Sequence, residues 1–154
     1  MATIGGYLNG DLAHCNGLFG QAEACVERGQ WAQAGIGIES FGLALERHLA
    51  MEEQVMFRAF EQAIGSDDGP TKLMRKEHKY LRGIIQRLSE SISQHQANDF
   101  FGHAETWHIT MRQHNLKEVD ILYPLADRLL AARQSEIIGA MDALCVAAQQ
   151  VSLG

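Results

Sequence analysis

Proline and long apolar runs are scarce in this sequence of 154 residues, and both scarcities narrow its possible structure. Only two prolines are present and β-branched residues are modest in number, which favours long uninterrupted helices. No window approaches 18 consecutive apolar residues, so we expect no membrane-spanning helix. The N-terminal stretch MATIGGYLNG has neither a basic start nor a long apolar middle, so we expect no secretory signal.

Basic residues are in the minority, with 13 Lys and Arg against 19 Asp and Glu and a formal net charge of -6. Nucleic acids and anionic membranes are bound by clustered Lys and Arg, so neither is expected as a partner. The three cysteines, Cys15, Cys25 and Cys145, are odd in number and show no C-x-x-C spacing. They indicate reduced thiols, and we therefore expect a cytoplasmic protein.

Helical periodicity is present along most of the chain. Apolar residues recur at spacings of three and four in five segments, namely residues 8–27, 31–63, 70–95, 98–124 and 135–150. Glycine just past residue 28, the loop GSDDGP and Pro124 should end or kink these segments. Short loops between long helices predict an all-α fold: an antiparallel up-down four-helix bundle with a short C-terminal helix packed outside it. No linker or repeat is visible, so residues 1–154 are expected to form one domain.

Polar residues interrupt the apolar stripes at matching places. His48 and Glu52 lie four residues apart in the second segment, and His114 and Glu118 repeat that spacing in the fourth. Residues i and i+4 lie only about 40° apart around a helix, so each pair shares one face. The third segment adds His78 on its apolar stripe. Counted from the helix turns, the three histidines are each about 27–28 Å along their helices, so all five side chains should converge on one layer.

Convergence of these five side chains points to a metal site. A lone histidine in a core usually hydrogen-bonds a neighbour, but three histidines and two glutamates would leave too much polar surface in a dry core. A bound cation neutralises the carboxylates and uses the imidazole lone pairs. Mixed imidazole and carboxylate donors suit iron, manganese or zinc, and two carboxylates that can each bridge suggest two ions.

The sequence resembles the hemerythrin-like (HHE cation-binding) domains. The resemblance covers most of the chain and is best in FGLALERHLAMEEQVMF, GPTKLMRKEHKYLR and MRQHNLKEVDILYPLADR. It implies a non-haem site of two iron ions with glutamate bridges and an oxo or hydroxo bridge. The ligands that it implies are His48, Glu52, His78, His114 and Glu118.

Two departures from the family pattern concern the remaining coordination positions. Oxygen-carrying hemerythrins have a histidine where this chain has Met74, so we expect more room for water or an exogenous ligand. On the first helix, Leu12 has the depth and angle of a ligand but no donor atom. We predict His14 as the sixth ligand, with Asp11 or water as alternatives.

Residues beside the predicted ligands receive weaker predictions. Glu53 and Glu77 are expected to turn away from the core into solvent. Tyr80 or Tyr123 could donate a hydrogen bond to a bound oxygen species, and the helical angle favours neither. The predicted function is binding or sensing of a small diatomic molecule, oxygen or nitric oxide. The alternatives are iron handling or repair under nitrosative stress, and a redox enzyme of the peroxidase or nitric oxide reductase type.

Overall fold

The computed structural model describes residues 2–153, and the side chains of residues 2–145. Helices account for all the regular secondary structure of this part of the chain, and it contains no strand. The all-α class predicted from the sequence is therefore confirmed. No helix within the described residues is long and apolar enough to cross a membrane.

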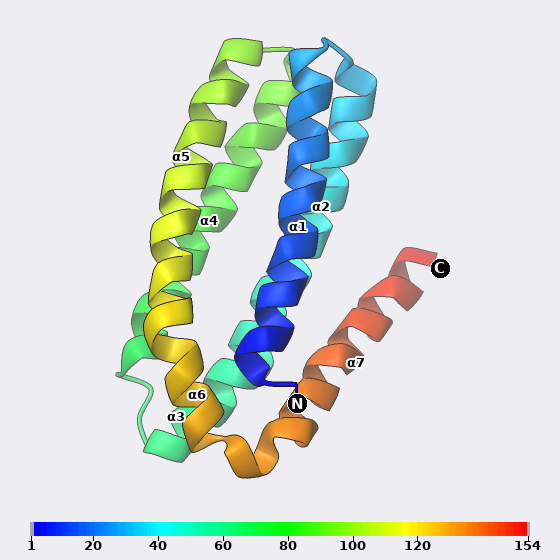
Figure 1. The fold of residues 1–154 in the computed structure, drawn as a ribbon. Coiled ribbons are helices and arrows are strands. Elements are labelled where there is room, and N and C mark those ends of the chain that lie inside the picture. The colour runs from blue at the N-terminus through cyan, green and yellow to red at the C-terminus, as the bar shows by residue number, and fades with distance from the viewer. Residues whose placement is uncertain (1, 154) are drawn as a thin grey trace.

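Five helical stretches follow one another along the chain (Figure 1). The elements are α1 (Ile4–Glu27), α2 (Trp31–Met51), η1 (Glu52–Met56), α3 (Phe57–Ile64), α4 (Pro70–Ser93), α5 (Ala97–Lys117), η2 (Glu118–Leu122), α6 (Tyr123–Leu129), η3 (Ala131–Arg133) and α7 (Gln134–Leu153). The segments α2, η1 and α3 form one continuous helical stretch, as do α5, η2 and α6. Three of the five stretches match the predicted ranges to within a few residues. Of the other two, α1 begins earlier than expected, and α6 extends past Pro124 to Leu129.

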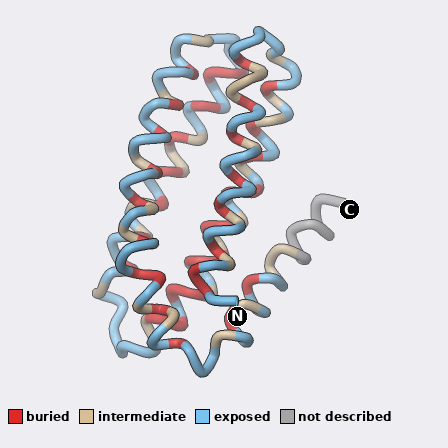
Figure 2. Tube along the Cα trace, in the orientation of Figure 1, coloured by how far each residue is buried: buried red, intermediate tan, exposed pale blue. Residues whose placement is uncertain are grey.

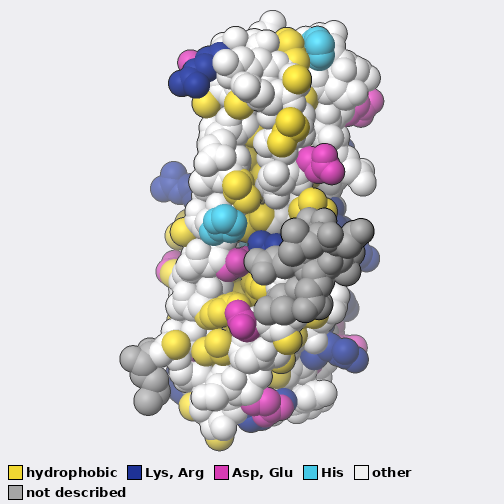
Figure 3. All heavy atoms as spheres, turned by 90° about the vertical axis from the view of Figure 1, so that its right-hand side faces the viewer, with side chains coloured by type: hydrophobic (Ala, Val, Ile, Leu, Met, Phe, Trp, Pro, Cys, Tyr) yellow, Lys and Arg dark blue, Asp and Glu magenta, His cyan; other side chains and the backbone are white. Residues whose placement is uncertain are grey.

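The long helices lie alongside one another, and α7 lies outside them next to α1 and α2 (Figure 1). Among neighbours, α1 packs most closely on α2, and α4 on α5. Buried residues recur on the sides of the helices that face each other (Figure 2). On the face where α7 lies, charged side chains of both signs are scattered rather than gathered into one patch (Figure 3).

Helix ends follow the local signals in the sequence. Gly29 and Gly65 have φ of 70° and 71°, the left-handed conformation that ends a helix and that glycine adopts without strain. Pro70 is in the first turn of α4, where its missing N–H costs nothing. At the start of α1, the Thr3 hydroxyl accepts a hydrogen bond from the Gly6 N–H, and Asp127 of α6 accepts one from the Ile4 N–H.

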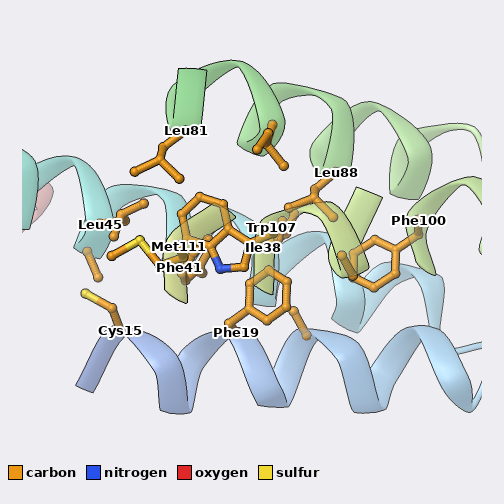
Figure 4. Close-up of a cluster of buried hydrophobic side chains, with 14 of the residues drawn as sticks. Cys15, Phe19, Ile38, Phe41, Leu45, Leu81, Leu88, Phe100, Trp107 and Met111 are labelled. Carbon is orange, nitrogen blue, oxygen red and sulfur yellow. The ribbon is translucent and has the colours of Figure 1, made fainter. Parts of the chain in front are cut away.

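Two apolar clusters fill the interior. The first is centred on Trp107, which stacks on Phe19 at 6.0 Å and meets Phe41 edge-on at 5.4 Å (Figure 4). The second lies around α3, α6 and α7 and includes Met56 and Phe57. Seven polar or charged residues are buried among the described side chains, and five of them are the predicted ligands His48, Glu52, His78, His114 and Glu118.

Pro124 does not end its helix, contrary to one of the two predicted outcomes. The chain widens into the π-helical segment η2 just before Tyr123, and α6 then continues to Leu129. Proline lacks the N–H that an α-helix would use four residues back, and Pro124 lies in the first turn of α6, directly after this wider turn. A second π-helical segment, η1, occurs in the other half of the chain with no proline nearby, so proline alone does not account for these segments.

Candidate metal centre

Glu52 and Glu118 hold equivalent places in the two halves of the chain. Each is the first residue of a π-helical segment, and each follows a histidine by four residues. The Glu52 carbonyl accepts a hydrogen bond from the Phe57 N–H, and the Glu118 carbonyl accepts one from the Tyr123 N–H. These bonds span five residues instead of four. Such π-turns are often found at functional sites because they change the direction of side chains within a helix.

The five predicted ligands lie together in the interior. Donor atoms of Glu52, His78, His114 and Glu118 all lie within 4.8 Å of one another. His48 adjoins them, with its Nε2 3.3 Å from the Glu52 Oε1. The side chains of all five are at most 1% exposed. We refer to His48, Glu52, His78, His114 and Glu118 as the donor cluster.

Each imidazole of the donor cluster is oriented by a carboxylate from another segment. The distances from Nδ1 to carboxylate oxygen are 2.9 Å for His48 and Asp11, 2.7 Å for His78 and Glu53, and 2.8 Å for His114 and Glu77. An ionised carboxylate can only accept, so each Nδ1 carries the proton and donates it. The Nε2 of each ring is thereby left to face the other donor atoms.

The inward-facing atoms of the donor cluster have no hydrogen-bond partner. They are Nε2 of His48, His78 and His114, Oε1 of Glu52, and both carboxylate oxygens of Glu118. Buried polar atoms without partners are costly, and buried carboxylates are normally paired or coordinate a metal. Four of these residues, Glu52, His78, His114 and Glu118, hold donor atoms within 4.8 Å of one another, and their imidazole and carboxylate groups fit a transition-metal cation.

A second layer of cations holds the orienting carboxylates. Arg82 donates to both oxygens of Glu53 at 2.9 and 3.0 Å, and Lys117 donates to Glu77. Burial raises the pKa of Glu53, but hydrogen bonds from His78 and Arg82 outweigh it and lower the pKa to about 2. Burial also raises the pKa of Glu77, and hydrogen bonds from Lys117 and His114 bring it below its usual value. Both carboxylates therefore stay ionised and keep their acceptor role at neutral pH.

The protonation of the histidines differs between the two halves of the cluster. Burial lowers the pKa of His48, but the hydrogen bond to Asp11 and the nearby Glu52 carboxylate raise it to about 9. Burial dominates at His114 and lowers its pKa despite the bond to Glu77. Without metal, the pKa of the His48 imidazole is thus raised beside Glu52, whereas that of His114 is lowered and its Nε2 presents a lone pair to Glu118.

Tyr123 adds a phenol to the donor cluster. Its hydroxyl donates to the Glu52 Oε2 at 3.3 Å, and the side chain is buried. Burial and then the Glu52 charge raise its pKa well above the usual value, so the phenol keeps its proton. A Cβ at Gly5 would lie 2.9 Å from the Tyr123 Cβ, so α1 can approach this closely only with glycine there. Tyr80, the other candidate from the sequence, is 53% exposed.

The structure does not bring the predicted sixth ligand to the cluster. His14 is exposed on α1, while Leu12 is buried and Asp11 is bonded to His48. Glu53 and Glu77 do not turn into solvent as expected, because each reaches a histidine on the neighbouring helix. A residue next to a ligand points about 100° away from it, which is toward the next helix of the fold. The orienting role of Glu53 and Glu77 had one signal in the sequence: each is an acidic residue directly beside a predicted ligand, at the level of a histidine on another helix.

Comparison with known protein families identifies a match. The family model of the hemerythrin HHE cation-binding domain matches residues 13–126, well over half of the chain. The matched range contains all five residues of the donor cluster, together with Glu53, Glu77 and Tyr123. Comparisons with curated proteins and with solved structures gave no match.

Proposed function

Since the chain belongs to the hemerythrin HHE cation-binding family, we propose that it is a non-haem di-iron protein that binds or senses oxygen or nitric oxide. In this proposal α1, α2, α4 and α5 form an antiparallel four-helix bundle, residues 1–154 form one domain, and the protein acts in the cytoplasm. The donor cluster holds the metal. Iron, expected as two ions with an oxo or hydroxo bridge, would supply the change of oxidation state and a coordination position for the diatomic molecule.

One observation carries the proposal: three buried imidazoles present unpartnered Nε2 atoms to two buried carboxylates, while their Nδ1 atoms are fixed by other carboxylates. Hydrogen bonding of the outer ring nitrogen fixes the tautomer and the direction of a metal-binding histidine. The donor set also exceeds the four ligands of a tetrahedral structural zinc site. The number and kind of donors favour iron at a site where carboxylates bridge two ions.

The surrounding residues keep the centre dry and fix its geometry. The Phe57 ring stacks on the His78 ring, with 5.4 Å between the ring centroids. The Arg75 guanidinium lies over the Phe57 ring, 5.4 Å from its centroid. Met56 and Leu122 of the two π-helical segments are buried beside the donors. Exclusion of water strengthens the electrostatic interactions within the site and would limit side reactions there.

Coordination beyond the five donors is left to water and to the gas. Asp11 is hydrogen-bonded to His48, and His14 is exposed. Met74 is buried, at the position where oxygen-carrying hemerythrins have a further histidine. Unfilled metal positions are what a diatomic molecule needs for direct coordination. Binding and sensing are therefore favoured over a closed structural site, in which protein groups fill every position.

Anaerobic loading with ferrous iron tests this function. We expect about two iron ions per chain, as for bridged two-metal sites, and a change in the absorption spectrum on exposure to nitric oxide or oxygen. His78→Ala should lose the iron, and His108→Ala should keep it, because His108 is an exposed histidine that pairs with Glu23 on the surface. Retention of no iron, equal iron in both variants, or no spectral change with either gas contradicts the proposal.

Two arms of the same experiment separate the alternative functions. A protein that delivers iron for repair releases it to an external chelator within minutes, whereas the burial of all five donors supports slow release. A redox enzyme turns over nitric oxide or peroxide repeatedly with an added reductant, whereas a binding protein gives one stoichiometric change. Rapid release or sustained turnover would replace the binding function with the corresponding alternative.

A further inference from the structure

We propose that small neutral molecules reach the donor cluster through a groove between α1 and α5, and that Leu12 controls their passage. The inference rests on the proposed function, because a passage needs a centre behind it. The groove has a volume of about 400 Å³. It is lined by Leu12, Asn16 and Phe19 of α1 and by Trp107, His108, Met111, Arg112 and Asn115 of α5.

The groove has a polar rim and an apolar floor. Asn16, His108 and Arg112 on the rim are exposed. Leu12, Phe19, Trp107 and Met111 on the floor are buried and belong to the first apolar cluster. Figure 4 shows Trp107 lying between Phe19 and Met111, with their side chains directed toward one another. Helices α1 and α5 pack less closely than α1 and α2 do. Because the two backbones are not in close contact, side chains of α1 and α5 form the floor of the groove.

Two residues that line the groove adjoin the donor cluster along the chain. Leu12 directly follows Asp11, whose carboxylate holds His48, and Asn115 directly follows His114. Leu12 and Met111 are only 5% and 6% exposed, so they form part of the buried floor of the groove. The Asn115 Oδ1 is buried there without a hydrogen-bond partner. This part of the groove is therefore lined by Leu12 of α1 and by Met111 and Asn115, one turn apart on α5.

The chemistry of the floor selects what can pass. Its four buried residues are apolar, and moving an ion through such surroundings costs far more than moving a neutral molecule. Oxygen and nitric oxide are neutral and small, whereas chelators and hydrated anions are neither. A larger hollow of about 1110 Å³ adjoins the loop before α4, but all its lining residues are exposed or half-buried and most are charged. It does not reach an apolar floor of this kind.

Leu12 is the residue through which the passage can be changed. It lines the groove, is buried, and lies on the inner stripe of α1 at the depth and angle that the sequence gives for a ligand. In this proposal its side chain is therefore the barrier between the groove and the donors. It bonds to no polar group, and exchanging it for another apolar residue removes no hydrogen bond. Leu12→Ala should widen the passage, and Leu12→Phe should narrow it.

The main test is the rate of nitric oxide binding to ferrous protein, followed by stopped-flow absorbance without oxygen. We expect an association rate about tenfold higher in Leu12→Ala and about tenfold lower in Leu12→Phe, each equivalent to about 1.4 kcal/mol in the barrier. Leu81→Ala is the matched control: Leu81 is a buried leucine of the same cluster, on α4, and does not line the groove. Iron content is measured in every variant.

A second measurement needs no metal. Trp107 lines the groove, and in a Trp31→Phe background its fluorescence reports how often dissolved oxygen reaches the floor. Quenching by oxygen should rise in Leu12→Ala and fall in Leu12→Phe, and it should stay unchanged in Leu81→Ala. This measurement keeps the inference testable if a variant loads iron poorly.

The outcomes distinguish the inference from the function beneath it. If the parent protein binds iron and nitric oxide but all variants share its rates and its quenching, the passage lies elsewhere and the inference is wrong. An equal acceleration in Leu81→Ala also overturns it, because any core cavity would then suffice. If the parent protein binds no iron or no nitric oxide, the proposed function fails, and the inference falls with it.

Discussion

Asp11 of α1 accepts a hydrogen bond of 2.9 Å from Nδ1 of His48 on α2. Helix α1 contributes no residue to the donor cluster, yet it fixes the orientation of the His48 ring. The same relationship continues around the fold. Glu53 of η1 holds His78 of α4, and Glu77 of α4 holds His114 of α5. These three bonds join the neighbouring helices in turn. Orientation of the imidazoles and assembly of the helices therefore depend on the same contacts.

Removal of an orienting carboxylate should weaken metal binding without removing a donor. We expect Asp11→Ala to lower iron affinity about 10- to 100-fold, the usual effect of losing the partner of a metal-binding histidine. Asp11→Asn should fall between that variant and the parent protein, since an amide oxygen still accepts but carries no charge. Competition with a chromophoric chelator measures the affinity.

Glu23→Ala is the matched control for this prediction. Glu23 also contacts a histidine, with 3.1 Å between its carboxylate and the His108 Nε2, but that pair is largely solvent-exposed. Iron affinity should stay at the parent value. If Asp11→Ala binds iron as tightly as Glu23→Ala does, the ring of His48 needs no fixed partner and the orienting role is wrong.

Glu118→Gln should separate metal binding from stability. In the metal-free protein both Glu118 oxygens lack partners, and Oε1 lies 3.0 Å from the His114 Nε2. Because Nδ1 of that ring donates to Glu77, Nε2 carries a lone pair that faces a carboxylate. A glutamine amide can donate to it, and it removes a buried charge. We expect the free energy of unfolding of the metal-free protein to rise by about 1–3 kcal/mol.

Denaturant unfolding of metal-free and iron-loaded protein checks this prediction. The variant should be more stable than the parent without metal and should gain less from iron, because a carboxylate ligand is lost. Glu105→Gln makes the same substitution at an exposed position and should change neither quantity. A metal-free Glu118→Gln protein that is less stable than the parent would show that the carboxylate is compensated in a way that its contacts do not reveal.

Sequence periodicity was sufficient to predict the helices and the two His–Glu pairs, and depth counted from the helix turns predicted that these pairs and His78 lie in one layer. His48 with Glu52 and His114 with Glu118 could be paired by the helical repeat alone. Contacts between helices could not be predicted in this way. The partners of Glu53 and Glu77 depend on how each helix is rotated against the next, and the apolar stripe defines that rotation only coarsely.

The π-helical segments were missed for a related reason. Their sequences, EEQVM and EVDIL, carry no residue that forbids an α-helix. A π-turn has less favourable hydrogen-bond geometry than an α-turn, so it forms where contacts with other helices stabilise it. Each begins at a buried glutamate, and the Nη2 of Arg75 donates to the Glu53 carbonyl within η1 at 3.1 Å. His14 was predicted as a donor because it is the only histidine of its helix. Its position around the helix axis, about 100° from the buried Cys15, leaves it exposed instead.

Tyr123→Phe should destabilise the metal-free protein through Glu52. The phenol donates to the Glu52 Oε2 in the buried layer, and phenylalanine leaves that oxygen without a partner while preserving the contact of the ring with Gly5. Loss of a hydrogen bond to a charged buried acceptor costs about 1–3 kcal/mol, and the 3.3 Å length favours the lower end. Tyr80→Phe, at an exposed tyrosine, should unfold like the parent protein. Equal midpoints for the two variants would show that the Tyr123 hydroxyl contributes nothing.

Acid should destabilise the end of α3 through Glu61. Its carboxylate accepts hydrogen bonds from Thr71 and Arg75 of α4 across the loop that joins the two helices. Burial raises the pKa of Glu61, but the bonds from Arg75 and Thr71 outweigh it, so the folded pKa lies below the usual 4.5. The folded state thus binds fewer protons than the unfolded state at this group. The resulting stability is fully present above about pH 4.5 and is lost as the pH falls through the lower folded value.

Glu61→Gln tests this pH dependence. At pH 7 the variant should be about 1 kcal/mol less stable than the parent protein, because a neutral amide accepts weaker hydrogen bonds from Arg75 and Thr71. The difference should shrink as the pH falls below about 4.5, since protonation removes the same charge from the parent. Urea unfolding of metal-free protein between pH 3 and pH 7 measures both effects. Glu136→Gln, at an exposed glutamate paired with Arg133, should follow the parent curve throughout. A Glu61→Gln deficit that stays constant down to pH 3 would assign the loss to packing rather than to charge.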